Sequence, residues 1–239
     1  MNMYDFYRPF LIHFRTRRMR MFQELFVVTP DTDVLDVGGN LFNWRLLQDR
    51  PRLTIVNVYE PGPDDLDGEC VTWVVGDARN LPFADKQFDV VYSNSVIEHL
   101  GDLPSQQAFA EEVARVGAGY FVQTPNRRFP IEPHYIAPLI HLLPPRWQMR
   151  LIRNFTLKGL LTRPTQEQCD EWVREVRLLD YRTLRQLFPD ARIYPERVMG
   201  LTKSFVVVRS ACDGDAPSCK AARSHLRETQ GSAQALPRG

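Results

Sequence analysis

The sequence predicts an α/β protein built on a mostly parallel sheet. Between residues 33 and 124, short apolar segments with β-forming composition alternate with segments that suit helices. Each apolar segment ends in glycine or in small polar residues. Strands that alternate with helical crossovers form parallel sheets, and such sheets bind ligands beyond the carboxyl ends of their strands.

The first strand is expected at 34–37, within the sequence VLDVGGN. An apolar run that enters Gly38 and Gly39 indicates a strand followed by a tight turn, where the backbone can approach a ligand. Asn40 stands where a third glycine is more usual. Asparagine is among the few residues besides glycine that tolerate the left-handed backbone region, so Asn40 need not close the site. A short helix is expected at 44–48.

The second and third strands also end in residues suited to a site. The second, at 53–59, is followed by Glu60, which lies 24 positions after Asp36. In dinucleotide-type folds an acidic residue at this point accepts hydrogen bonds from ribose hydroxyls. The third strand, at 71–75, runs into Gly76 and Asp77.

The fourth and fifth strands, at 88–92 and 120–124, flank a helix expected at 104–116. The fourth is followed by Ser93, Asn94 and Ser95, and the fifth ends at Thr124 before a proline. Carboxyl ends of parallel strands share one edge, so five strand ends are predicted to converge on one site.

Length, charge and cysteines narrow the class of protein. The chain has 239 residues and a net charge of +1, which gives no overall preference for nucleic acid. Its four cysteines form no CxxC pair and no zinc-like spacing with histidine, so we expect reduced thiols, no metal and a cytoplasmic location. The charge is unevenly distributed, because residues 31–126 carry a net −10 and residues 127–163 a net +6.

Four regions are predicted. Residues 1–30 mix aromatic side chains with arginines and are expected to form a helical cover, with contact to an anionic membrane surface as the alternative. Residues 31–126 and 180–210 form the ligand-binding domain. Residues 127–179 are a helical insertion that directly follows a strand of the site and is placed to cover it. Residues 211–239 contain only two large aliphatic residues and are expected to be a disordered tail.

At this point a family resemblance becomes specific. The segments VLDVGGN, YEP, VVGDARNLPFADKQFDVVYSNSVIEHL and YFVQTPN resemble class I S-adenosylmethionine-dependent methyltransferases of the small-molecule group, which includes ubiquinone-biosynthesis-like enzymes. The resemblance covers about residues 33–126 and resumes at 180–209. It implies a Rossmann-like, seven-stranded, mostly parallel sheet with helices on both faces and an antiparallel last strand. The closing elements would be a helix at 181–187 and strands at 191–198 and 204–209.

The resemblance also implies roles for the strand ends, with S-adenosyl-L-methionine as the cofactor. The first turn would hold the methionine part, Glu60 the ribose, Asp77 the adenine amino group with Ala78 beside the ring, and Asn94 and Ser95 the methionine side. The residues so assigned to the turn are Asp36, Gly38, Gly39 and Asn40. A negative environment suits a cofactor that carries a sulfonium and an ammonium group.

The methyl acceptor is predicted to lie under the insertion. An alcohol acceptor needs a base, and His134 is the first candidate, with Glu132 as its orienting carboxylate and His99 as the second candidate. Tyr135 and Trp147 are predicted to contact the acceptor with Glu132, whereas His141 is expected in a core. We therefore predict methyl transfer to oxygen of a small-molecule, glycan or lipid-linked acceptor.

Three alternatives stay open at this stage. A non-catalytic methyltransferase-like subunit conflicts with intact Asp36, Glu60 and Asp77. An NAD(P) oxidoreductase conflicts with the first turn, which lacks the GxGxxG pattern. Nucleic-acid modification would suit the basic insertion, but the fourth strand is followed by SNSV, not by an (N/D)PP(Y/F)-like sequence.

Overall fold

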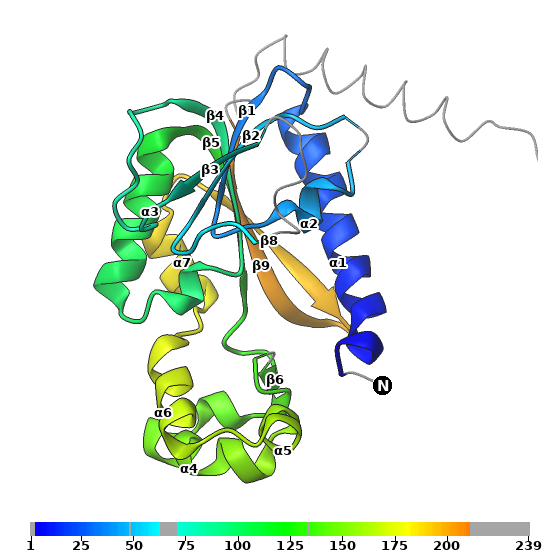
Figure 1. The fold of residues 1–239 in the computed structure, drawn as a ribbon, viewed down its shortest axis with the longest axis vertical. Helices are drawn as coiled ribbons and strands as arrows, with labels where there is room; N and C mark the ends of the chain where they lie inside the picture. Colours follow the sequence, from blue (N-terminus) through cyan, green and yellow to red (C-terminus); the bar gives the residue numbers. More distant parts are fainter. Residues whose placement is uncertain (1–2, 48, 63–70, 133, 211–239) are drawn as a thin grey trace, which may run out of the picture.

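The computed structural model describes residues 3–47, 49–62, 71–132 and 134–210, with side chains from residue 12 onward. Its centre is a seven-stranded sheet of order β3-β2-β1-β4-β5-β9-β8 (Figure 1). Its strands are β1 (Asp33–Val37), β2 (Arg52–Asn57), β3 (Val71–Val75), β4 (Phe88–Asn94), β5 (Gly117–Pro125), β8 (Arg192–Val198) and β9 (Leu201–Arg209). The first five are parallel, and β9 runs antiparallel to both of its neighbours, β5 and β8. The predicted sheet is confirmed.

The pairing register brings the strand ends to one edge. Val37 at the end of β1 pairs with Val56 of β2 and Ser93 of β4, and Asn94 pairs with Gln123 of β5. Because β9 is antiparallel, its first residues lie at this same edge. The edge therefore collects the turns in which the sequence places its candidate ligand-binding residues.

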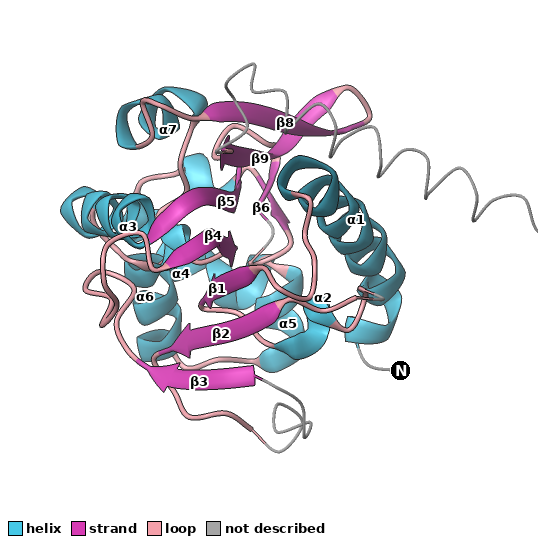
Figure 2. Cartoon of the chain, turned by 90° about the horizontal axis from the view of Figure 1, so that it is seen from above, coloured by secondary structure: helices cyan, strands magenta, loops and turns pink. Residues whose placement is uncertain are grey.

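Helices cover both faces of the sheet (Figure 2). One face carries α1 (Met3–Phe26) and α2 (Leu41–Trp44). The other carries α3 (Leu103–Val116), which follows the short 3₁₀ helix η2 (Ile97–His99), and α7 (Tyr181–Leu187). The two cores follow the alternation of the strands. In β4, Val90 and Tyr92 belong to the core under α1, whereas Val91 belongs to the core under α3.

The α1 core is centred on Phe22. Its ring makes edge contacts with Trp44, Tyr92 and Phe121 at centroid distances of 5.8, 5.3 and 5.6 Å. Aromatic pairs in this geometry add stabilisation beyond the apolar area that they bury. Helix α1 is therefore an integral layer of the domain along the residues whose side chains are described.

Residues 127–179, hereafter the lid, lie beyond the carboxyl edge of the sheet (Figure 1). The lid contains β6 (Ile131–Glu132), β7 (Ala137–Pro138), η3 (Ile140–Leu142), α4 (Pro145–Phe155), α5 (Leu157–Thr162) and α6 (Gln166–Glu175). It packs around a small core of its own, formed by Tyr135, Ala137, Ile140, Ile152 and Cys169.

Two local expectations are corrected. The first helix after β1 begins at Leu41, because the Asn40 side chain accepts a hydrogen bond from the Phe42 amide and caps the N-terminus of the helix. It ends at Trp44, where the sequence predicts its start. His141 is only partly buried and lines a cleft. The expected tail at 211–239 lies outside the described residues, and no described helix is long and apolar enough to cross a membrane.

Candidate functional site

The turn after β1 is shaped by two glycines. Gly38 takes a left-handed backbone with φ of +73°, a conformation that glycine adopts without cost. A Cβ on Gly39 would lie 1.9 Å from Oδ2 of Asp36, so no larger residue fits above that carboxylate. Asn40 is extended, with φ of −149°, so the turn does not use the left-handed conformation that asparagine tolerates, and Gly38 takes that conformation.

Asp36 carries the most unusual carboxylate of this turn. It is fully buried, and its Oδ2 accepts a hydrogen bond of 2.7 Å from Nε1 of Trp44. Its Oδ1 has no hydrogen-bond partner among the described residues. Burial raises the pKa of Asp36 to about 7, although the bond from Trp44 and the charge of Arg15 act in the opposite direction. A buried, unpaired carboxylate oxygen beside a glycine turn fits the cationic part of S-adenosylmethionine.

The other expected cofactor residues lie along the same edge. Glu60 is exposed just beyond β2, and Ala78 is buried. Asp77 is half-exposed, and both of its oxygens accept hydrogen bonds from Nε of Arg79, at 2.9 and 3.0 Å. This bond and the arginine charge hold the pKa of Asp77 below its ordinary value. Asp77 is therefore ionised at neutral pH and already paired within its own loop.

The end of β4 is tied to helix α1 by a contact that the sequence analysis missed. Nη1 of Arg18 donates to Oδ1 of Asn94 at 2.7 Å, and Nε of Arg18 donates to Glu196 of β8 at 2.8 Å. Ser204 of β9 also donates a hydrogen bond to Glu196. The available signal was an arginine inside the apolar stripe of α1, immediately before Met19.

Ser95 follows Asn94 with a left-handed backbone, at φ of +59°. Its hydroxyl donates a hydrogen bond of 2.9 Å to the side chain of Gln123 on β5. Nearby, the guanidinium of Arg15 lies 4.8 Å from the centre of the Phe42 ring. Helix α1 thus brings two arginines, Arg15 and Arg18, to the edge where the first turn and the end of β4 meet.

The two candidate bases lie together under the lid. Nδ1 of His134 donates to Oε1 of Glu132 at 2.6 Å, and Oε2 of Glu132 accepts from the Tyr135 amide. The rings of His134 and His99 are 4.8 Å apart between centroids and meet edge to face. The structure therefore brings His99 to the pair of Glu132 and His134, which lies more than 30 positions further along the sequence.

Glu98 completes this cluster, and the sequence analysis gave it no role. It is fully buried, its Oε2 accepts from Thr124 at 2.9 Å, and its Oε1 has no hydrogen-bond partner among the described residues. Glu98, His99 and His134 each offer one ligand-type atom, and these atoms lie within 4.8 Å of one another. The signal was the acidic residue directly before His99 in the segment VIEHL.

The two histidines titrate in opposite directions. Burial, together with the smaller effect of the nearby His134, lowers the pKa of His99 to about 4. Burial also lowers the pKa of His134, but the hydrogen bond and charge of Glu132 outweigh burial and leave it above its ordinary value. His99 is therefore neutral at neutral pH, and His134 is the more basic of the pair.

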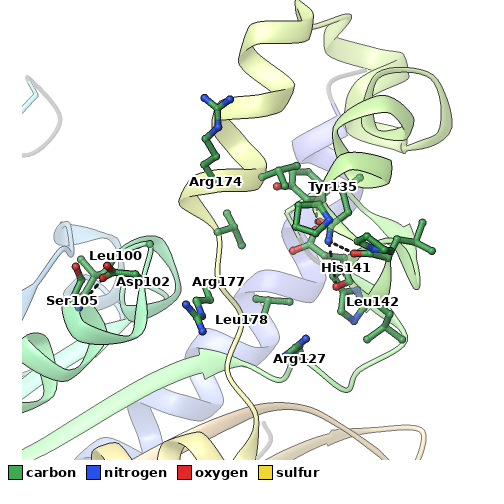
Figure 3. A pocket seen from close by; sticks show the side chains of 18 residues that line it. Leu100, Asp102, Ser105, Arg127, Tyr135, His141, Leu142, Arg174, Arg177 and Leu178 are labelled. Atoms are coloured by element: carbon green, nitrogen blue, oxygen red, sulfur yellow. Dashed lines mark hydrogen bonds between the residues drawn. The ribbon is translucent and has the colours of Figure 1, made fainter.

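A cleft of about 880 Å³ separates the lid from the start of α3. In Figure 3, Asp102 and Ser105 lie on one side of it and His141 and Leu142 on the other, with Arg127 and Arg177 between them. Glu132 and Tyr135 also line this cleft. Trp147, half-exposed on α4, does not line it, and neither do His134 and His99.

Comparison with known proteins agrees with this geometry. The sequence model of the methyltransferase domain family matches residues 55–121. An uncharacterized protein of Mycobacterium tuberculosis is 41% identical over 56 residues, which make up 23% of this chain and 19% of that protein. The match thus spans about a fifth of the curated relative's length.

Solved structures share the fold at low sequence identity. The 1,6-didemethyltoxoflavin-N1-methyltransferase of Burkholderia thailandensis, solved with S-adenosylhomocysteine, is 16% identical, with a TM-score of 0.50 over 81% of this chain and 76% of that one. A Rhodobacter sphaeroides structure named for Zn-dependent alcohol dehydrogenases is 15% identical, with a TM-score of 0.55 over 81% and 89%. At 15–16% identity, structural similarity shows a shared fold and not a shared activity. The name of the second structure therefore gives no support to the oxidoreductase alternative.

The strand order, the glycine turn with its buried Asp36 and the family match agree with one another. The chain therefore contains a class I S-adenosylmethionine-dependent methyltransferase domain.

Proposed function

We propose that this methyltransferase domain transfers the methyl group to an oxygen of a small-molecule, glycan or lipid-linked acceptor held under the lid. The observation that carries the proposal is the hydrogen-bonded pair of His134 and Glu132, which faces His99 beside the ends of β4 and β5. A histidine oriented by a carboxylate is a common arrangement for removing a proton from a hydroxyl group.

The chemistry divides between cofactor and protein. S-adenosylmethionine supplies a methyl group that is already activated by its sulfonium. The bound cofactor would supply this methyl group to the acceptor oxygen and leave as a neutral thioether, and His134 would take the hydroxyl proton at Nε2. Glu132 keeps the proton on Nδ1, so that Nε2 is the free basic atom.

The residues of the strand ends are proposed to hold the cofactor. Asp36, next to Gly38, Gly39 and Asn40, would hold the cationic methionine part, with Asn94 and Ser95 beside it. Glu60 would accept hydrogen bonds from the ribose hydroxyls. Asp77 and Ala78 would meet the adenine, and Asp77 would then exchange its bond with Arg79 for one with the adenine amino group.

The cleft supports an acceptor that carries negative charge. Arg127, Arg174 and Arg177 line it, and none of them forms an ion pair with another cleft residue among those described. Glu132 and Tyr135 line the same space, whereas Trp147 would contact only an acceptor that reaches out of the cleft onto α4.

The test uses radiolabelled S-adenosylmethionine and matched acceptors that differ only in a hydroxyl, amine or carboxyl group. We expect label in the hydroxyl compound, a mass gain of one CH₂ group, and loss of transfer in His134→Ala. Transfer to the amine or carboxyl compound with normal rates in His134→Ala would contradict oxygen transfer by this base. Cofactor binding without transfer to any acceptor would favour the non-catalytic subunit.

A further inference from the structure

The exposed apolar side chains of this protein are concentrated in the lid. Of the 18 large apolar side chains that are exposed among the described residues, nine lie between residues 127 and 163. Scattered single residues of this kind are normal on a protein surface, whereas a concentration marks an interaction surface. The lid is therefore the part of the described chain where a binding surface is most expected.

Most of this surface lies on two consecutive helices. On α4, Trp147 near the start and Phe155 at the end are exposed at 47% and 71%. On α5, Leu157, Leu160 and Leu161 are all exposed and share the spacing of one helical face. Ile152 of α4 is fully buried in the lid core, and Leu151, one turn from both Trp147 and Phe155, packs against that core, so these two side chains stand at the margin of the buried side.

The charges on these helices are all positive. Residues 139–163 contain five basic residues and no acidic residue. Arg146, Arg150 and Arg153 are exposed, follow one another along α4 next to its apolar side, and form no ion pair among the described residues. An apolar face flanked by arginines is the pattern of a helix that lies in the interface of an anionic membrane.

The surface also continues into the cleft. Leu142, Leu143, Pro144 and Pro145 line the cleft, and α4 begins at Pro145, immediately before Arg146 and Trp147. An amphiphile that leaves a bilayer under α4 would therefore meet the cleft opening directly. This continuity points to a membrane and not to a second protein as the occupant.

We propose that the docking surface formed by Trp147, Phe155, Leu157, Leu160 and Leu161, with Arg146, Arg150 and Arg153, binds an anionic lipid bilayer and presents the cleft to a lipid-linked acceptor. The inference deepens the proposed function, and its acceptor clause rests on that function. Binding to the bilayer itself needs neither acceptor nor cofactor, so it is measured separately.

The experiment is cosedimentation of the full chain with vesicles of phosphatidylcholine alone and with vesicles that also contain phosphatidylglycerol. We expect binding to the anionic vesicles only, and weaker binding as salt increases, because exposed charges are screened. Phe155→Asp with Leu160→Asp should abolish it. Replacing Arg146, Arg150 and Arg153 together by Gln should weaken it by about 100-fold, from the usual contribution of each cation near an anionic surface.

Matched controls carry the same changes elsewhere. Met199→Asp changes an apolar residue that is 98% exposed on the β8–β9 turn, and Arg17, Arg20 and Arg182 replaced together by Gln remove three exposed arginines from α1 and α7. Both controls should bind like the wild type, and all variants should keep the wild-type melting temperature.

Several outcomes would overturn the docking proposal. They are equal binding to neutral vesicles, wild-type binding by both lid variants, or a dimer in light scattering that Phe155→Asp with Leu160→Asp dissociates while vesicles stay unbound. Calorimetry with S-adenosylmethionine on the same proteins separates the two proposals. If the wild type binds the cofactor but no vesicles, only the docking proposal is rejected. If it binds vesicles but no cofactor, only the proposed function is rejected.

Discussion

Arg18 and Glu196 are 178 positions apart in the sequence, yet their side chains form an ion pair of 2.8 Å at the carboxyl edge of the sheet. Both side chains are nearly buried, at 7% and 11% exposure. The pair joins the first helix to the hairpin of β8 and β9, and Arg18 extends the link to Asn94. Helix α1 is thereby fixed to the part of the edge where the cofactor is proposed to bind.

Removing the arginine should destabilise the fold strongly. Arg18→Met leaves the Glu196 carboxylate buried without its cation, and breaking a buried pair in this way costs about 3–5 kcal/mol. The double variant Arg18→Met with Glu196→Gln should recover part of the loss, because no unpaired charge is left. Urea denaturation of the four proteins in this cycle gives the coupling energy, and additive losses would contradict a direct interaction.

Asp36 should make stability and cofactor affinity depend on pH. Its folded pKa of about 7 lies above the ordinary value of 3.8, so its stabilising contribution is complete below about pH 4 and is lost as the pH rises through about 7. Cofactor affinity should change in the opposite direction, because the ionised carboxylate attracts a cation. We expect tighter binding at about pH 8 than at about pH 6.

Asp36→Asn should flatten both pH profiles, whereas Asp49→Asn, at an exposed position, should leave them as in the wild type. Calorimetric titrations with S-adenosylmethionine and urea melts at the two pH values provide the comparison. An unchanged pH dependence in Asp36→Asn would assign it to other groups.

Glu60 tests the proposed ribose contact. Because Glu60 is exposed, Glu60→Ala should not affect the melting temperature. It should weaken S-adenosylmethionine binding by about 1–3 kcal/mol, the range for lost hydrogen bonds to a charged group. Asp49→Ala serves as the matched control. Unchanged affinity in a folded Glu60→Ala protein, measured by calorimetry, would reject the assignment.

His134 and Glu132 can be separated by their kinetic effects. His134→Ala should lower kcat by about 10²–10⁴-fold with cofactor binding unchanged, since it removes the base. Glu132→Gln should lower the pKa of His134, because it removes the charge that keeps that pKa raised. The acidic limb of the kcat profile should then move to lower pH. His13→Ala, on the exposed side of α1, is the control. A normal kcat in His134→Ala would transfer the proposal to His99.

The sequence predicted the sheet well because its signals are local. Alternating apolar residues and the small or polar residues after each strand are visible in the chain itself, and even the antiparallel β9 lay within a few residues of its expected position. The pair of Glu132 and His134 is local as well, because the two residues are two positions apart. Such contacts need little of the tertiary structure.

The missed features all depend on contacts between distant segments. Glu98 is part of a site only because the folded lid places His134 close to it. Arg18 likewise links two elements only because β8 supplies Glu196 as its partner. The helix-capping role of Asn40 could not be read from the sequence, because its amino-acid type suits both a left-handed turn and a helix cap. Gly39 stands above Asp36, a constraint that no spacing along the chain expresses.

The lid's separate core has a consequence for how this protein can change. The lid core includes Tyr135, Ile140, Ile152 and Cys169, which pack among themselves. Replacing one of these residues therefore changes the packing of the lid and not that of the sheet. The strand ends proposed to hold the cofactor belong to the other body of the molecule. Changes within the lid core can therefore alter the proposed acceptor side and leave the edge proposed to hold the cofactor as it is, whereas Leu179, at the end of the lid, belongs to the core under α3.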